Sequence, residues 1–216
     1  MLTDLLKWGG KRPDSPPGFA PAVARSADDP VMASKAFPKF VSLLAPRTSP
    51  LLLDFGPVVG SNVEFYGERL GCKLFIEDLI GEVDRHARAG TTGQRAESLK
   101  TRFRHADSTV DGILCWDLFD FLDKAAVQAL AQQIVRMLKP GGAVLGLFCT
   151  SSVERSTYTK FEIVDEKNLR CRTHSGAGGA RRTLQNRDII KMCEGLSVSD
   201  SFLLKNNTRE MLLRRP

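Results

Sequence analysis

The sequence lacks the features that mark membrane-spanning, disulfide-stabilised and zinc-binding proteins. No window of the 216 residues approaches the roughly 18 consecutive apolar residues of a membrane span. The first ten residues carry charges where a secretion signal would be apolar, so we expect a cytoplasmic protein with no membrane partner. The five cysteines are odd in number and contain no Cys-x-x-Cys pair, so they form neither a disulfide framework nor a zinc site.

Acidic residues are scarce at the C-terminal end. Residues 167–216 hold eleven basic and four acidic residues, a net charge of +7, whereas the whole chain carries +6. We expect this segment to face an anionic partner, such as RNA, an acidic protein or a charged small acceptor. The alternative is a solvated surface without a partner, because no aromatic residues are interleaved for base stacking.

The first 32 residues are rich in glycine and proline and have little apolar periodicity. Such a segment cannot form a core of its own. We therefore predict a flexible or loosely docked arm at 1–32 and a single domain at 33–216.

Helical spacing and short apolar runs alternate along that domain. We expect helices at 33–45, 63–70, 79–88 and 124–138, and strands at 51–55, 73–76, 112–116 and 143–149. The segment 99–104 fits a helix or a strand. A further helix at 187–194 precedes an antiparallel hairpin of 196–205 and 209–214 around Asn206-Asn207. This order predicts an α/β fold, a Rossmann-like doubly wound, mainly parallel sheet in a three-layer sandwich.

Three motifs occur in order along this predicted sheet. They are Leu51-Leu52-Leu53-Asp54-Phe55-Gly56-Pro57-Val58-Val59-Gly60, the acids Glu77-Asp78, and Met137-Leu138-Lys139-Pro140-Gly141-Gly142-Ala143-Val144-Leu145. Together with the terminal hairpin they resemble the class I S-adenosylmethionine-dependent methyltransferases, from about residue 33 to the C-terminus. The resemblance implies S-adenosylmethionine as the cofactor and methyl transfer to an acceptor that the sequence does not identify.

The motifs suit a ligand at the carboxyl edge of the sheet. Glycines in the first strand-to-helix turn let the backbone approach a ligand, and an acid closing the second strand can accept hydrogen bonds from both ribose hydroxyls. Glu77 lies 23 residues after Asp54, about the spacing required for that role. The predicted cofactor-binding residues are Asp54, Gly56, Val58, Gly60, Glu77, Asp78, Asp107, Cys115 and Trp116.

Some residues depart from the family pattern. Val58 stands where a Gly-x-Gly-x-Gly turn has glycine, and a β-branched side chain resists a positive φ, so we expect weakened cofactor binding. Trp116-Asp117-Leu118-Phe119 replaces the Asp/Asn-Pro-Pro-aromatic motif of the nitrogen-methylating branch. No catalytic residue is assigned, because His105 and His174 stand in polar loop contexts where a base has no special support. Three acids are expected at helix starts facing solvent rather than at a metal site: Asp117, Asp120 and Asp123.

Two other functions remain open. A binding or scaffold protein could keep the methyltransferase fold without turnover, which Val58 and the missing acceptor motif both permit. A nicotinamide-dependent oxidoreductase would need glycines where Val58 and Ser61 stand, so it is disfavoured.

Overall fold

A six-stranded sheet forms the centre of the molecule in the computed structural model, which describes residues 29–150, 157–176 and 183–216. The strand order is β3-β2-β4-β5-β9-β8. The strands are β2 (Leu51–Asp54), β3 (Lys73–Ile76), β4 (Val110–Trp116), β5 (Leu138–Cys149), β8 (Ser197–Leu203) and β9 (Thr208–Arg214). The first four run parallel, whereas β9 runs antiparallel to β5 and to β8. The predicted parallel sheet with a C-terminal antiparallel hairpin is therefore confirmed.

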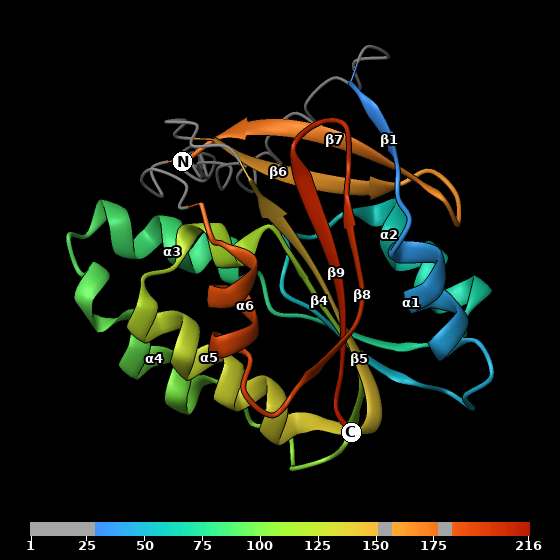
Figure 1. Cartoon of the computed structure of the whole chain (residues 1–216), viewed down its shortest axis with the longest axis horizontal. Helices are drawn as coiled ribbons and strands as arrows, with labels where there is room; N and C mark the ends of the chain where they lie inside the picture. The colour runs from blue at the N-terminus through green and yellow to red at the C-terminus, as the bar shows by residue number, and fades with distance from the viewer. Residues whose placement is uncertain (1–28, 151–156, 177–182) are drawn as a thin grey trace, which may run out of the picture.

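Helices cover both faces of this sheet (Figure 1). One face carries α3 (Leu79–Arg88), α4 (Arg95–Arg102), α5 (Lys124–Met137) and α6 (Asn186–Met192). The other carries α1 (Phe37–Leu44) and α2 (Gly60–Glu64), which continues into the π-helical turn η1 (Phe65–Arg69). The ambiguous segment 99–104 falls mostly in α4, and two short 3-10 turns are η2 (Thr92–Gln94) and η3 (Leu118–Phe121). Among the described residues, no helix is long and apolar enough to cross a membrane.

The central strands β2 and β4 and the second half of β5 are mainly apolar because they lie between two cores. In β4, Ile113 and Cys115 belong to the core under α5, whereas Leu114 belongs to the core under α1 with Phe40. A strand buried on both faces needs a continuous apolar run rather than an alternating one. This explains why the central strands are visible in the sequence.

A second, three-stranded sheet was not predicted. It consists of β1 (Val31–Ala33), β7 (Asn168–Ser175) and β6 (Thr157–Ile163), in the antiparallel order β1-β7-β6. In Figure 1 its strands β6 and β7 cross above the carboxyl ends of the parallel strands. Strand β1 spans the predicted boundary at residue 32, and residues 1–28 lie outside the described part of the chain, so the arm stays a prediction.

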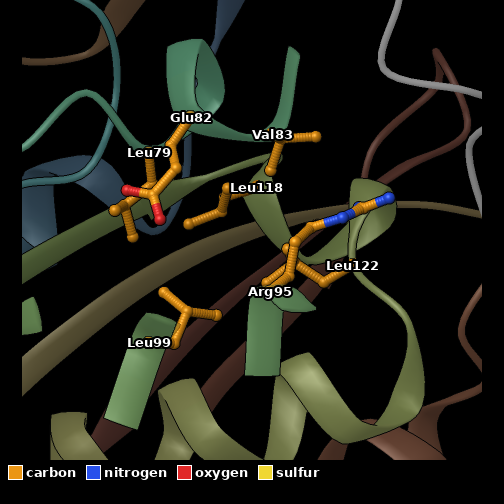
Figure 2. A pocket seen from close by; sticks show the side chains of 7 residues that line it. All are labelled: Leu79, Glu82, Val83, Arg95, Leu99, Leu118 and Leu122. Carbon is orange, nitrogen blue, oxygen red and sulfur yellow. The ribbon is translucent and has the colours of Figure 1, made fainter. Parts of the chain in front are cut away.

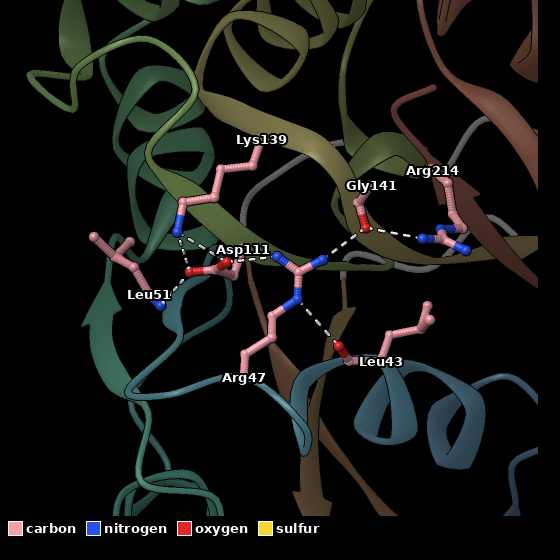
Figure 3. Close-up of polar contacts among 7 residues, drawn as sticks. All are labelled: Leu43, Arg47, Leu51, Asp111, Lys139, Gly141 and Arg214. Atoms are coloured by element: carbon pink, nitrogen blue, oxygen red, sulfur yellow. Dashed lines mark hydrogen bonds and ion pairs between the residues drawn. The ribbon is translucent and has the colours of Figure 1, made fainter.

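A charged network ties the amino ends of the strands together (Figure 3). The buried carboxylate of Asp111 accepts hydrogen bonds from Arg47 Nη1 at 2.6 Å, Lys139 Nζ at 2.9 Å and the backbone N–H of Leu51 at 2.9 Å. Burial raises the pKa of Asp111, but the hydrogen bonds from Leu51, Lys139 and Arg47 outweigh it and hold that pKa below its ordinary value. The carbonyl of Gly141 accepts from Arg47 and from Arg214. Strand β5 begins at Leu138, earlier than predicted, because Leu138 pairs with Val110 of β4, and the Lys-Pro-Gly-Gly motif lies within the strand, where Lys139 and Gly141 join the network.

Candidate functional site

A buried carboxylate, that of Asp54, is hydrogen-bonded to the backbone of the turn that follows β2. Oδ1 of Asp54 accepts a hydrogen bond from the backbone N–H of Gly56 at 2.8 Å and one from Trp116 Nε1 at 2.7 Å. Burial raises the pKa of Asp54 to about 6, against the lowering effect of those two hydrogen bonds. Asp54 therefore joins the turn to the end of β4 and is not exposed to solvent.

The side chain of Trp116 fills the space above Gly56. A Cβ atom placed on Gly56 would lie 2.7 Å from Cδ1 and 2.9 Å from Nε1 of the indole. Trp116 is only 4% exposed, has a φ of +48°, and stacks on Phe161 of β6 with ring centroids 5.2 Å apart. Gly56 is thus required by the packing of this tryptophan, whatever else binds there.

The rest of the turn is open. Val58 is 63% exposed, and nothing lies within 4 Å of a Cβ atom placed on Gly60. The φ of Val58 is not positive, so the strain expected from a β-branched side chain at this position does not arise. Val58 instead adds an apolar side chain to the exposed rim of the turn.

Glu77 and Asp78 close the neighbouring strand β3. The backbone N–H of Glu77 donates to the carbonyl of Asp54 at 2.8 Å, which places the two strand ends side by side. The Glu77 carboxylate is 23% exposed, and it lies 3.3 Å from Arg102 Nη2 and 3.5 Å from His105 Nε2. Its oxygens keep lone pairs for further donors. The exposed Asp78 has a φ of +38° and caps α3 by accepting from the N–H of Gly81 at 3.0 Å.

Two predicted site residues lie apart from the turn after β2 and from the acids at the end of β3. The thiol of Cys115 is fully buried in the core under α5, where burial raises its pKa far above the ordinary value. Asp107 precedes β4 at the opposite edge of the sheet, and its carboxylate pairs with Arg136 Nη1 at 2.7 Å. The structure therefore brings together Asp54, Gly56, Val58, Gly60, Glu77, Asp78 and Trp116.

The acids after β4 are not the solvent-facing group that the sequence suggested. Asp117 and Asp120 are 3% and 0% exposed, because η3 turns back beneath the strand ends and Asp120 Oδ2 accepts from the N–H of Cys149 at 3.0 Å. Asp123 does cap α5, by accepting from the N–H of Ala126. Within the described ranges, no group of three or more His, Cys, Asp or Glu side chains is placed to hold a metal ion.

The cavity shown in Figure 2 is too small for a ligand. It lies between α3, α4 and η3 and has a volume of about 10 Å³, about the space of one water molecule. Its lining is mainly apolar, with Leu79, Leu99, Leu118 and Leu122 pointing into it.

A larger groove lies between the turn and the hairpin formed by β6 and β7. Its volume is about 280 Å³. We call it the hairpin groove; it is lined by Val58, Val59, Gly60, Ser61, Lys160, Glu162, Arg172 and His174. Asn62 fixes the hairpin beside the turn, because its side chain donates to the carbonyl of Phe161 and accepts from the N–H of Ile163, both at 2.8 Å. His174 lies on β7 beside the groove, and not in the polar loop that the sequence suggested. His105 lies beside the carboxylate of Glu77.

The basic residues of the C-terminal segment are spread over the molecule. Arg170 and Arg172 lie on β7 and pair with Glu162. Arg214 and Arg215 lie at the opposite edge of the sheet, where they donate to the carbonyls of Gly141 and Leu138. The anionic partner of the whole segment stays a prediction, and Arg181 and Arg182 lie outside the described residues.

Comparisons with known proteins agree with this architecture. Residues 53–146 match the family model described as a methyltransferase domain. The structure is similar to that of 1,6-didemethyltoxoflavin-N1-methyltransferase from Burkholderia thailandensis, with bound 1,6-didemethyltoxoflavin and S-adenosylhomocysteine, at 13% identity over 84% of this chain and 78% of that chain (TM-score 0.50). A protein from Pyrococcus horikoshii OT3 is 14% identical over 85% of this chain and 92% of that chain (TM-score 0.49). No curated protein sequence matches the chain.

These findings identify the fold of the protein. It is the Rossmann-like fold of the class I methyltransferases, and residues 53–146 match a methyltransferase domain. The resemblance predicted from the turn, the strand-end acids and the terminal hairpin is confirmed.

Proposed function

We propose that this protein is an S-adenosylmethionine-dependent methyltransferase that binds its cofactor at the turn 55–60 and at Glu77. The observation that carries the proposal is the adjacency of the open turn and a partly exposed carboxylate at neighbouring strand ends of a methyltransferase domain. The similar Burkholderia enzyme was crystallised with S-adenosylhomocysteine, which supports the same class of cofactor here.

The residues present suit the cofactor at the rim of the site. Glu77 would accept hydrogen bonds from the ribose hydroxyls, and the exposed backbone around Val58 and Gly60 would face the methionine part. When bound, the cofactor supplies an electrophilic methyl group on a sulfonium sulfur. The protein's contribution is to align the acceptor with that methyl group and to exclude water. A cytoplasmic location also stays a prediction.

One observation favours a second candidate, a scaffold that keeps the fold without turnover. The indole of Trp116 occupies the space above Gly56, where the backbone of the turn could otherwise approach a ligand. A protein that never binds the cofactor could keep this packing permanently.

Thermal unfolding with and without S-adenosylhomocysteine separates the two candidates. Ligand at about a hundred times its Kd stabilises a native state by roughly 2.7 kcal/mol, which raises the Tm of a chain of this length by about 5 to 11 °C. We expect such a shift in the wild type and its loss in Glu77→Ala, with retention in Glu97→Ala as the matched control, because Glu97 is exposed on α4. Absence of any shift in the wild type, with no cofactor co-purifying by mass spectrometry, would favour the scaffold.

A further inference from the structure

The hairpin groove has one charged wall and one apolar wall. Along β6 the side chains alternate, so that Phe161 and Ile163 pack into the core while Lys160 and Glu162 line the groove. The opposite wall comes from the turn, where the side chain of Val58 is exposed. A groove of this kind suits a ligand that is acidic at one end and apolar at the other.

Two basic side chains face each other across the hairpin. Lys160 is the direct cross-strand partner of Arg172, and like charges in that arrangement destabilise a sheet. Arg172 is compensated by Glu162 at 2.6 Å and by Asp29 at 3.3 Å. Lys160 has no ion-pair partner in the described part of the chain. An anion bound between the two would relieve their repulsion.

The other titratable residues of the groove do not supply that anion. The carboxylate of Glu162 already lies between Arg170 Nη1 at 3.3 Å and Arg172 Nη2 at 2.6 Å. Burial lowers the pKa of His174, and the positive charges of Lys160 and Arg172 lower it further, so the imidazole is neutral at pH 7. Among the residues that the structure describes, the groove therefore presents one uncompensated cation, Lys160.

We propose that the hairpin groove binds the acidic group of a small methyl acceptor, with Lys160 as its anchor. The volume of about 280 Å³ is just below the roughly 300 to 1,000 Å³ typical of ligand pockets, which suits the acidic end of a small acceptor. A carboxylate and a phosphate would both serve as the acidic group. Assigning this anion to the methyl acceptor rests on the proposed function, whereas binding of the anion does not.

The first test measures anion binding without any cofactor. Inorganic phosphate and benzoate are titrated separately into the wild type by calorimetry at constant ionic strength, and the probe that binds identifies the acid. We expect Lys160→Met to raise the Kd of the probe that binds by about tenfold or more, because a charge-assisted hydrogen bond is lost. Lys160→Arg should retain binding, and so should Lys205→Met, which removes the same charge from the exposed turn between β8 and β9. No binding of either probe, or equal weakening by Lys160→Met and Lys205→Met, overturns the proposal.

The second test separates the acceptor from the cofactor as the source of the anion. If the groove holds the acceptor, S-adenosylhomocysteine should bind Lys160→Met and the wild type with the same Kd, and it should not displace the probe. Displacement of the probe, together with weaker S-adenosylhomocysteine binding to Lys160→Met, would assign the groove to the cofactor's own carboxylate and overturn the acceptor assignment. Anion binding that depends on Lys160 in a protein that binds no S-adenosylhomocysteine would overturn the proposed methyltransferase function and leave the anion site standing.

Discussion

Trp116 is the residue on which the candidate site depends most. Its indole donates to Asp54, packs on Gly56 and stacks on Phe161, so it links the turn, the end of β4 and the hairpin. The sequence predicts Trp116 as a cofactor-binding residue, and that role stays a prediction. In the structure it occupies the space above the glycine.

Replacing the side chain of Trp116 should lower the stability of the protein and raise its affinity for S-adenosylhomocysteine. We expect Trp116→Ala to lower the free energy of unfolding by about 3 to 5 kcal/mol, the usual cost of truncating a large buried aromatic residue. The same change empties the space above Gly56, so S-adenosylhomocysteine should bind more tightly, as calorimetry would measure. Phe119→Ala, at a buried aromatic residue stacked on Phe148, controls for a general loss of packing. Weaker binding to Trp116→Ala would show that the indole is itself part of the cofactor's contact surface.

Single residues of the turn were predictable from the sequence, but their neighbours were not. Gly56, Gly60 and Glu77 follow short apolar strands, and the parallel order of those strands brings them to one edge. The packing of Trp116 depends on Phe161, which comes from a hairpin far along the chain, and local sequence carries no signal of such a contact. The burial of Asp120 was missed for the same reason, because its partner is the backbone of β5.

At the scale of elements, the hairpin of β6 and β7 determines the shape of the site. Its strands were not predicted, since charged residues such as Lys160, Arg170 and Arg172 interrupt the apolar pattern that identified the central strands. In β6 only Phe161 and Ile163 face the core shared with α1, while Lys160 and Glu162 lie on the other side of the strand and line the groove. Asn62 joins this hairpin to α2 through two hydrogen bonds to its edge.

Loss of the Asn62 side chain should loosen the hairpin without unfolding the central sheet. Asn62→Ala leaves the carbonyl of Phe161 and the N–H of Ile163 without these partners, at a cost of about 1 to 3 kcal/mol for buried groups left unpaired. We expect faster hydrogen exchange across β6 and β7 and unchanged exchange in β2 and β4. Asn168→Ala is the control, since that side chain donates to the exposed carboxylate of Asp165 at the turn of the hairpin. Equal acceleration in every strand would contradict the local role of Asn62.

At the scale of the whole molecule, the two edges of the central sheet perform different tasks. The carboxyl edge carries the turn, the strand-end acids and the hairpin groove. The amino edge is closed by the network around Asp111, which joins the segment after α1 to β2, β4 and β5. The charged network therefore lies at the amino ends of the strands, and the proposed binding site lies at their carboxyl ends, where ligands bind in open α/β sheets.

The amino edge should make the fold sensitive to acid. Because folding lowers the pKa of Asp111, its charged form contributes stability above the ordinary carboxyl pKa of 3.8 and loses that contribution as the pH falls through the lower folded value. Asp111→Asn should lower the free energy of unfolding by about 2 kcal/mol at pH 7, since hydrogen bonds to a charged acceptor are replaced. The difference between wild type and variant should shrink as the pH falls below about 4. A difference in Tm that stays constant from pH 7 to pH 3 would contradict this assignment.

The position of the Trp116 indole also bears on the affinity of the proposed site for its cofactor. A site whose competent form is only partly populated binds with an apparent Kd equal to the intrinsic Kd divided by that population. If the indole leaves the space above Gly56 in about one molecule in a hundred, the apparent affinity falls by about a hundredfold although every contact with the ligand is unchanged. A partner or acceptor that draws the β6–β7 hairpin away from the sheet would remove this factor and raise the occupancy of the site at constant cofactor concentration.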